Sequence, residues 1–180
     1  MATLVLDQLK YPIGKYVKPE QFSEADMKSF IHRIDHLPFA IREAISGLDD
    51  SQLDTPYRDG GWTIRQVVHH LADSHLNAYC RFKLGYTEDL PTIRPYEENA
   101  WANTEDGQHG QLDLSLDLLK SLHYRWVFFL RSFKETDWQR KIYHPESKKE
   151  YDLFQLLAMY AWHGDHHLAH IVSLKKRMGW

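Results

Sequence analysis

Four long segments of this chain of 180 residues repeat their apolar side chains at the three- and four-residue spacing of an α-helix. We expect these helices at residues 23–47, 63–84, 113–133 and 152–176. A helix with one apolar face has to bury that face against a neighbour, and four helices of similar length can do so together in a bundle. The pattern therefore predicts an all-α fold, namely a four-helix bundle.

Residues that favour helix ends support two of these boundaries. Ser23 precedes an acidic first turn, which is typical of a helix start. Asp152 stands three residues before Gln155, which is the spacing of a capping box. Pro38 falls inside the first predicted helix and is expected to kink it.

The segments between the helices complete the expected fold. Residues 85–111 are rich in proline and glycine and are expected to form a long central connection, with a short helix near 97–103. A connection of this length in a compact domain is usually functional or crosses a bundle. We expect a small hairpin or loop at 138–151 and an extended N-terminal arm at 1–20, all within a single domain that spans 1–180.

Charge and cysteine content narrow the classes of function. The net charge is -3 and no basic stripe is present, which argues against nucleic acid as a partner. No apolar run approaches the roughly 20 residues that span a bilayer, and the N-terminus does not resemble a signal peptide. The single cysteine, Cys80, excludes a disulfide within the chain, favours a cytoplasmic location, and is expected to serve packing.

The histidines of the last predicted helix carry the strongest functional signal. His163 and His167 fall on the apolar stripe of that helix, and their spacing of four places both imidazoles on one face, where they can share a metal ion. Burying two adjacent imidazoles without a partner costs free energy, and a bound ion removes that cost. His166 and His170 project to the flank of the stripe, so we expect them to be solvated or to support the ligands from outside.

A third ligand has to come from another helix, and the second predicted helix offers His69, His70 and His75. Periodicity leaves all three open, because His75 lies nearest the centre of the stripe and the other two lie on its opposite shoulders. Asp73 follows His70 by one turn, but it is equally suited to pair with an arginine of the same helix. The remaining histidines have no partner at ligand spacing and are expected to be structural or exposed: His32, His36, His109, His123 and His144.

Several motifs in order, over nearly the whole chain, resemble the YfiT-like branch of the DinB superfamily. They are YPIG at 11–14, GGWT at 60–63, QVVHHLADSH at 66–75, TIRPY at 92–96, YHP at 143–145, YAWH at 160–163, HLAHI at 167–171 and RMGW at 177–180. This resemblance implies a DinB-type bundle, a homodimer, and one metal ion held by His70, His163 and His167. Members are described as metal-dependent hydrolases, and one branch is linked to the transfer of thiols such as bacillithiol onto electrophiles.

A site of three histidines leaves at least one coordination position open, which is the pattern of a catalytic metal. We expect one divalent ion per chain, with zinc preferred and nickel as the alternative. Such an ion lowers the pKa of a bound water and deprotonates a bound thiol, so the site suits both hydrolysis and thiol transfer. No second catalytic group is evident, since Asp165 projects away from the ligand stripe. A bound thiol needs less help from a protein base than water does, which favours thiol transfer.

Three functions are therefore open, beside a structural bundle that binds no metal. The preferred one is a metal-dependent transferase that acts on a small-molecule thiol and an electrophile, and the second is a metal-dependent hydrolase. The third is a non-catalytic metal-binding stress protein. A pocket beside the metal, lined by the central connection and the turn at 58–62, would favour the two enzymes, whereas a closed site with four protein ligands would favour the third.

Overall fold

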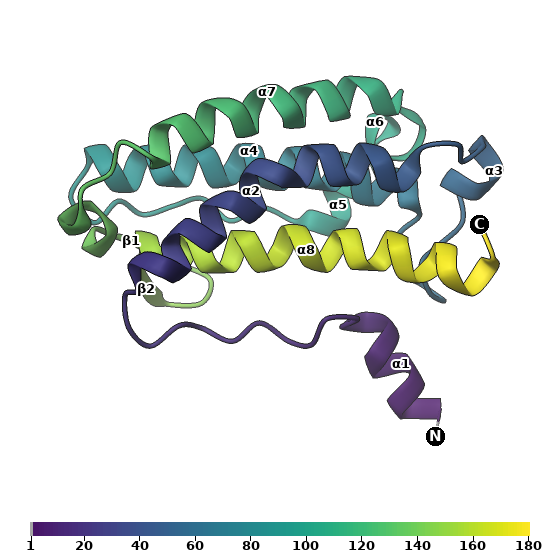
Figure 1. The fold of residues 1–180 in the computed structure, drawn as a ribbon, viewed down its shortest axis with the longest axis horizontal. Helices are drawn as coiled ribbons and strands as arrows, with labels where there is room; N and C mark the ends of the chain where they lie inside the picture. Colours follow the sequence, from purple (N-terminus) through teal and green to yellow (C-terminus); the bar gives the residue numbers. More distant parts are fainter. Residues whose placement is uncertain (1) are drawn as a thin grey trace.

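Four long helices lie side by side along the molecule in the computed structural model, which describes residues 2–180 (Figure 1). The predicted four-helix bundle is confirmed, and each observed helix lies close to its predicted range. The bundle consists of α2 (Glu24–Ile45), α4 (Ile64–Thr87), α7 (Leu112–Leu130) and α8 (Leu153–Met178).

Side-chain caps set the starts of three of these helices. The Ser23 hydroxyl accepts a hydrogen bond from the third residue of α2, and the Asp152 carboxylate does the same for α8. Thr63 and Gln66 form a reciprocal capping box at the start of α4. Each cap is worth about 1 kcal/mol of helix stability. Pro38 lies inside α2, which bends along its length in Figure 1, as the sequence predicts.

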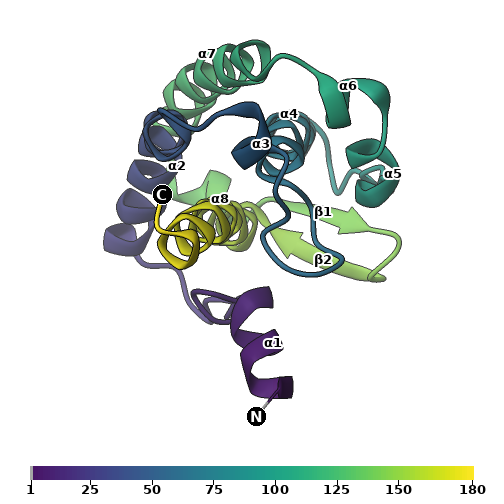
Figure 2. The ribbon, with the colours of Figure 1, turned by 90° about the vertical axis from the view of Figure 1, so that its right-hand side faces the viewer.

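The order of the helices around the bundle departs from a simple up-and-down arrangement. Both α2 and α4 pack against α7 and α8, so these two consecutive long helices occupy opposite corners (Figure 2). The short helix α3 (Asp50–Leu53) and a turn carry the chain across one end of the bundle. The consequence for function is that α4 and α8, which carry the candidate histidines, lie next to each other.

The central connection packs against the hairpin and against α4. The hairpin was predicted, and it consists of β1 (Lys141–His144) and β2 (Lys149–Asp152), which pair antiparallel after the short 3-10 helix η1 (Glu135–Gln139). The connection runs along β1, because the Ile93 N–H donates to the Tyr143 carbonyl. It then forms α5 (Glu98–Ala102), near the predicted short helix, and α6 (Glu105–His109), which the sequence did not predict. The Gln66 side chain of α4 donates to the Ala102 carbonyl at 2.8 Å and so ties α5 to the bundle.

The prediction of an extended arm at residues 1–20 is wrong for its first half. Residues 2–10 form a helix, α1 (Ala2–Lys10). Leucine, glutamine and lysine in this stretch are good helix formers, and the prolines and glycine on which the expectation rested all follow it. The second half is an arm without helix that runs along α8, where the Tyr16 hydroxyl donates to the Gln155 carbonyl at 3.1 Å (Figure 1).

Two apolar clusters fill the bundle, and a layer of buried histidines separates them. One cluster surrounds Phe82, Trp126 and Tyr160, and the other surrounds Leu71 and Ile171. Each of α4, α7 and α8 contributes histidines where it passes from one cluster to the other. Within residues 2–180, no helix is long and apolar enough to cross a membrane.

Candidate metal centre

The structure brings His70 of α4 together with His163 and His167 of α8. One ring nitrogen from each of the three lies within 4.8 Å of those of the other two. The spacing of four on α8 stacks His163 and His167 on one face, with ring centroids 4.5 Å apart, and His70 reaches across from the neighbouring helix. Periodicity had left His69 and His75 open as the third partner, and only His70 joins the cluster.

One pair of nitrogens in this cluster has the separation expected of two ligands on one ion. His70 Nε2 and His163 Nε2 are 3.2 Å apart. Two imidazole nitrogens bound to a tetrahedral zinc ion at about 2.05 Å each would be about 3.3 Å apart. His167 also keeps a buried nitrogen, Nδ1, with no hydrogen-bond partner among the described residues. The three side chains therefore fit a divalent ion, and their role as ligands stays a prediction.

Burial keeps the three imidazoles neutral, which is the form that binds metals. Burial lowers the pKa of His70 to about 4. It lowers the pKa values of His163 and His167 well below the usual value, with a further contribution from neighbouring histidines. A cluster of neutral imidazoles would leave the full charge of a bound divalent ion available to a ligand in the open position.

The turn before α4 covers this cluster. Trp62 lies over His70, with ring centroids 4.5 Å apart, and stacks near His167 at 6.1 Å. Its indole N–H donates to Asn99 at 3.2 Å, so the turn and the central connection meet above the site. Gly60 adopts a φ of +64°, a left-handed conformation that glycine tolerates best, and this shapes the turn.

A chain of buried imidazoles leads away from the cluster on its far side. His163 Nδ1 lies 3.2 Å from His75 Nε2, and His75 Nδ1 lies 2.7 Å from His123 Nε2. His123 Nδ1 in turn lies 2.6 Å from the backbone carbonyl of Ile34. His123 is buried, as a structural histidine should be, but its contact with His75 could not be anticipated because the two residues belong to different helices.

The other histidines near the cluster have partners of their own. His69 contacts Ser115 Oγ at 2.7 Å and the Gly110 carbonyl at 3.2 Å. His166 and His170 were expected to be solvated or to support the ligands from outside, and the first of these alternatives is wrong, because both are buried and their Nε2 atoms lie 3.0 Å apart. Among the described residues, neither forms a hydrogen bond with a candidate ligand, so the second alternative stays a prediction. The physical reason is cover from outside the helix: a tyrosine of the N-terminal arm approaches His166, and Tyr57 stacks on His170 at 3.9 Å.

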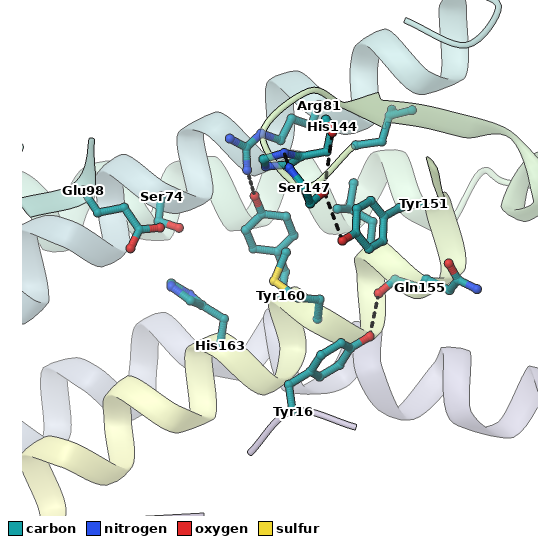
Figure 3. A pocket seen from close by; sticks show the side chains of 13 residues that line it. Tyr16, Ser74, Arg81, Glu98, His144, Ser147, Tyr151, Gln155, Tyr160 and His163 are labelled. Atoms are coloured by element: carbon teal, nitrogen blue, oxygen red, sulfur yellow. Dashed lines mark hydrogen bonds between the residues drawn. The ribbon is translucent and has the colours of Figure 1, made fainter. Parts of the chain in front are cut away.

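Two cavities open beside His163. The first, of about 290 Å³, is lined by His163 together with polar side chains of α4, the hairpin and the arm (Figure 3). The second, of about 280 Å³, is lined by His163, His167, the turn around Arg58 and residues 98–99 of the central connection. The second cavity is lined by the central connection and the turn at 58–62, the arrangement that was expected to favour an enzyme.

Glu98 is the acidic residue that both cavities share, and it was not among the residues predicted from the sequence. Its side chain reaches solvent at the rim, but partial desolvation raises its pKa; the charge of Arg81 opposes this rise and that of Glu146 adds to it. Figure 3 shows the Glu98 carboxylate on the same side of the first cavity as His163 and Ser74. One signal was available: Glu98 begins the short helix within a connection whose length already indicated function.

Three other candidates lie outside the cavities. Asp165 pairs with Arg33 of α2 at 2.7 Å, in agreement with its predicted direction away from the cluster. Asp73 forms no ion pair with an arginine among the described residues, and burial raises its pKa to about 6. The prediction that Cys80 serves packing is wrong, because the side chain is exposed.

Comparison with known proteins finds relatives that are named for a metal-dependent hydrolase activity. A family model described as the DinB superfamily matches residues 33–171. A protein of Geobacillus thermodenitrificans named "Putative metal-dependent hydrolase" is 51% identical over 175 residues, which cover 97% of this chain and 98% of the relative. "Putative metal-dependent hydrolase YfiT" of Bacillus subtilis is 48% identical over 172 residues, covering 96% and 97% of the two chains.

A solved structure of YfiT from Bacillus subtilis has the same fold. It matches with a TM-score of 0.94 and 48% sequence identity, and the match covers 96% of this chain and 99% of the other. That structure is described as "a probable metal-dependent hydrolase with an unusual four-helix bundle topology". The resemblance inferred from the sequence motifs is confirmed.

Proposed function

This chain belongs to the DinB superfamily, and we propose that it is a metal-dependent enzyme that transfers a small thiol to an electrophile. The observation that carries the proposal is the cluster of His70, His163 and His167 with two cavities that both reach His163. The names of its relatives support metal dependence and hydrolysis. Thiol transfer is the finer proposal, and hydrolysis by a metal-bound water is its alternative.

The two cavities favour transfer over hydrolysis. A transfer reaction brings two organic molecules to one metal, whereas hydrolysis brings one molecule and water. Each cavity has a volume of nearly 300 Å³, at the lower end of the range of small-molecule sites. Because both touch His163 and Glu98, a thiol in one and an electrophile in the other would meet beside the metal. A closed site, as expected of a non-catalytic metal-binding protein, would have neither cavity.

The protein's own residues supply the remaining steps. When bound at the three histidines, a divalent ion would lower the pKa of a thiol and thus favour the thiolate. Glu98 lines both cavities and would accept the thiol proton, and its raised pKa makes it a better proton acceptor than an ordinary carboxylate. The sulfur then forms a bond to the electrophilic carbon, and the leaving group departs with its electron pair. Trp62 and the turn restrict water at the histidines.

Arg81 indicates which thiols the first cavity would prefer. Its guanidinium donates to the Tyr160 hydroxyl at 2.7 Å and to a backbone carbonyl at 3.3 Å. Within residues 2–180 it forms no ion pair with a carboxylate. Glu98 lies in the same cavity and its charge acts on Arg81 without forming an ion pair, but Arg81 Nε is buried and has no hydrogen-bond partner among the described residues. A guanidinium with an unused donor in a cavity favours a substrate with an acidic group. We therefore expect a thiol that carries a carboxylate.

The test uses the zinc-loaded and the nickel-loaded protein with two matched thiols and one electrophile. Cysteine and its decarboxylated analogue cysteamine are each incubated with monobromobimane, and the products are analysed by mass spectrometry. We expect the conjugate to form faster than with metal-stripped protein, and faster for cysteine than for cysteamine. Equal rates for both thiols would contradict the role of Arg81.

Hydrolysis is tested in the same samples with p-nitrophenyl acetate and no thiol. Metal-dependent release of p-nitrophenol without any metal-dependent conjugation would replace the transferase with the hydrolase. If the protein binds metal tightly but accelerates neither reaction, the non-catalytic alternative is favoured and the enzyme proposal fails.

A further inference from the structure

We propose that His75 and His123 are positioning residues that fix the tautomer of His163, so that the Nε2 lone pair of His163 faces His70 and is available to a metal ion. This inference rests on the proposed metal site and assigns a role to two buried histidines outside it. The connected groups are His163, His75, His123 and the Ile34 carbonyl, which we call the imidazole relay.

The Ile34 carbonyl, at the far end of the relay from His163, determines which ring nitrogens donate and which accept. The Ile34 carbonyl can only accept a hydrogen bond, so His123 Nδ1, at 2.6 Å, has to carry a proton. A neutral imidazole has one N–H, which leaves His123 Nε2 as an acceptor. His75 Nδ1, at 2.7 Å from it, therefore donates, and His75 Nε2 is left as an acceptor.

The last step reaches the candidate metal site. Since His75 Nε2 accepts, His163 Nδ1 donates to it across 3.2 Å. His163 Nε2 then keeps its lone pair, and this is the atom that lies 3.2 Å from His70 Nε2. A histidine that binds a metal through one nitrogen generally donates its other N–H to a fixed acceptor. Here the acceptor is another histidine, held in turn by a third.

Burial excludes the alternative in which the central imidazole is charged. A doubly protonated His75 would donate to both of its neighbours. His163 Nδ1 would then have to accept, which would place the proton of His163 on Nε2. His75 and His123 are 0% and 1% exposed, and neither makes a hydrogen bond or ion pair with a carboxylate among the described residues; Asp35 acts on His123 only through its more distant charge. A buried charge without a counter-ion is strongly unfavourable. The neutral arrangement is therefore the one that satisfies every ring nitrogen in the relay.

Pro38 explains why a carbonyl in the middle of α2 is free to anchor the relay. In an α-helix the carbonyl of residue 34 accepts from the N–H of residue 38. Residue 38 is proline, which has no N–H, so Ile34 has no such donor within its own helix. His123 of α7 takes that place. The proline that bends α2 thus also supplies the acceptor at which the relay ends.

The first test is the tautomeric state of the wild-type protein. Nitrogen NMR of protein labelled with 15N-histidine distinguishes a protonated from an unprotonated ring nitrogen, and variants at each position assign the signals. We expect Nδ1 to be protonated in His163, His75 and His123, in the metal-free and in the zinc-loaded protein. An unprotonated Nδ1 on His163 would overturn the inference. The metal-free measurement decides this even if the protein takes up no metal, an outcome that would reject only the proposed function.

The second test compares two substitutions at the same position by competition with a zinc chelator. His123→Leu removes the acceptor for His75, and we expect zinc affinity to fall by about 10–100-fold, the usual cost of losing a group that orients a ligand. His123→Gln offers one donor and one acceptor and should restore most of that affinity. His170→Gln, a buried control outside the relay, should bind as the wild type does. Wild-type affinity in a folded His123→Leu variant would overturn the proposal, and if that variant does not fold, the tautomer measurement decides.

Discussion

Gly164, the neighbour of His163 on α8, sets how closely that helix approaches α2. A Cβ atom at this position would lie 2.5 Å from Leu37 Cδ2 and 3.3 Å from Cδ1. Leu37 is buried and has little room to move. In an unhindered helix, glycine to alanine stabilises by about 1 kcal/mol. Overpacking of a core costs about 1–3 kcal/mol. We therefore predict that Gly164→Ala destabilises the protein by about 1 kcal/mol, measured by urea denaturation of the metal-free form.

The same substitution in a Leu37→Ala variant separates the steric cost of the new methyl group from the helix preference of alanine over glycine. Leu37→Ala alone should cost about 2–5 kcal/mol, because it leaves a cavity. In that background the new methyl group has space, so Gly164→Ala should become stabilising by about 1 kcal/mol. The sign of the effect of Gly164→Ala therefore reverses between the two backgrounds, as a double-mutant cycle would reveal. The same sign in both would refute the close contact between α8 and α2.

Three further predictions concern charge, catalysis and assembly. Burial raises the pKa of Asp73 from 3.8 to about 6, so the folded state binds this proton more tightly and loses stability as pH rises from about 4 through 6. The full shift corresponds to about 3 kcal/mol, and solvent screening at this half-exposed site reduces the effect to about 1 kcal/mol. Asp73→Asn should therefore raise the free energy of unfolding by about 1 kcal/mol at pH 7 and leave it unchanged at pH 3, as measured by urea denaturation. Glu98→Gln should lower turnover about 100-fold or more while the metal content, measured by mass spectrometry, is unchanged, and full activity would exclude Glu98 as the proton acceptor. We propose that the homodimer implied by the family resemblance covers Phe39 and Tyr124, which are 64% and 76% exposed beside one hollow of α2 and α7. Light scattering should show a dimer for the wild type and a monomer for Tyr124→Lys, and a wild-type monomer would contradict it.

Most of the bundle could be predicted from the sequence because the position of each helix depends on residues that are close together in the chain. Apolar spacing gave the four long helices, and caps such as Ser23 and Asp152 marked their starts. The helix α1 was missed because the proline and glycine that follow it dominated the interpretation of the whole segment. The arrangement of α2 and α4 on opposite corners depends on packing between helices, which no single helix encodes.

The candidate site was predictable only where its residues share one helix. His163 and His167 could be paired from their spacing, but His70 needed the family resemblance, since periodicity did not separate it from His69 or His75. The burial of His166 and His170 depends on segments far away in the sequence, which cover them from outside the helix. The contact of His75 with His123 joins two helices for the same reason, so no pattern within either helix could indicate it.

The metal content of the purified protein tests the account most directly. After dialysis against zinc and then against metal-free buffer, inductively coupled plasma mass spectrometry should find one ion per chain in the wild type and in the control His170→Gln. Alanine at His70, His163 or His167 should abolish that stoichiometric ion, while helical circular dichroism persists because the surrounding core is apolar. Retention of a full ion in any of these three variants, or its loss in the control alone, would contradict the assignment of the metal centre.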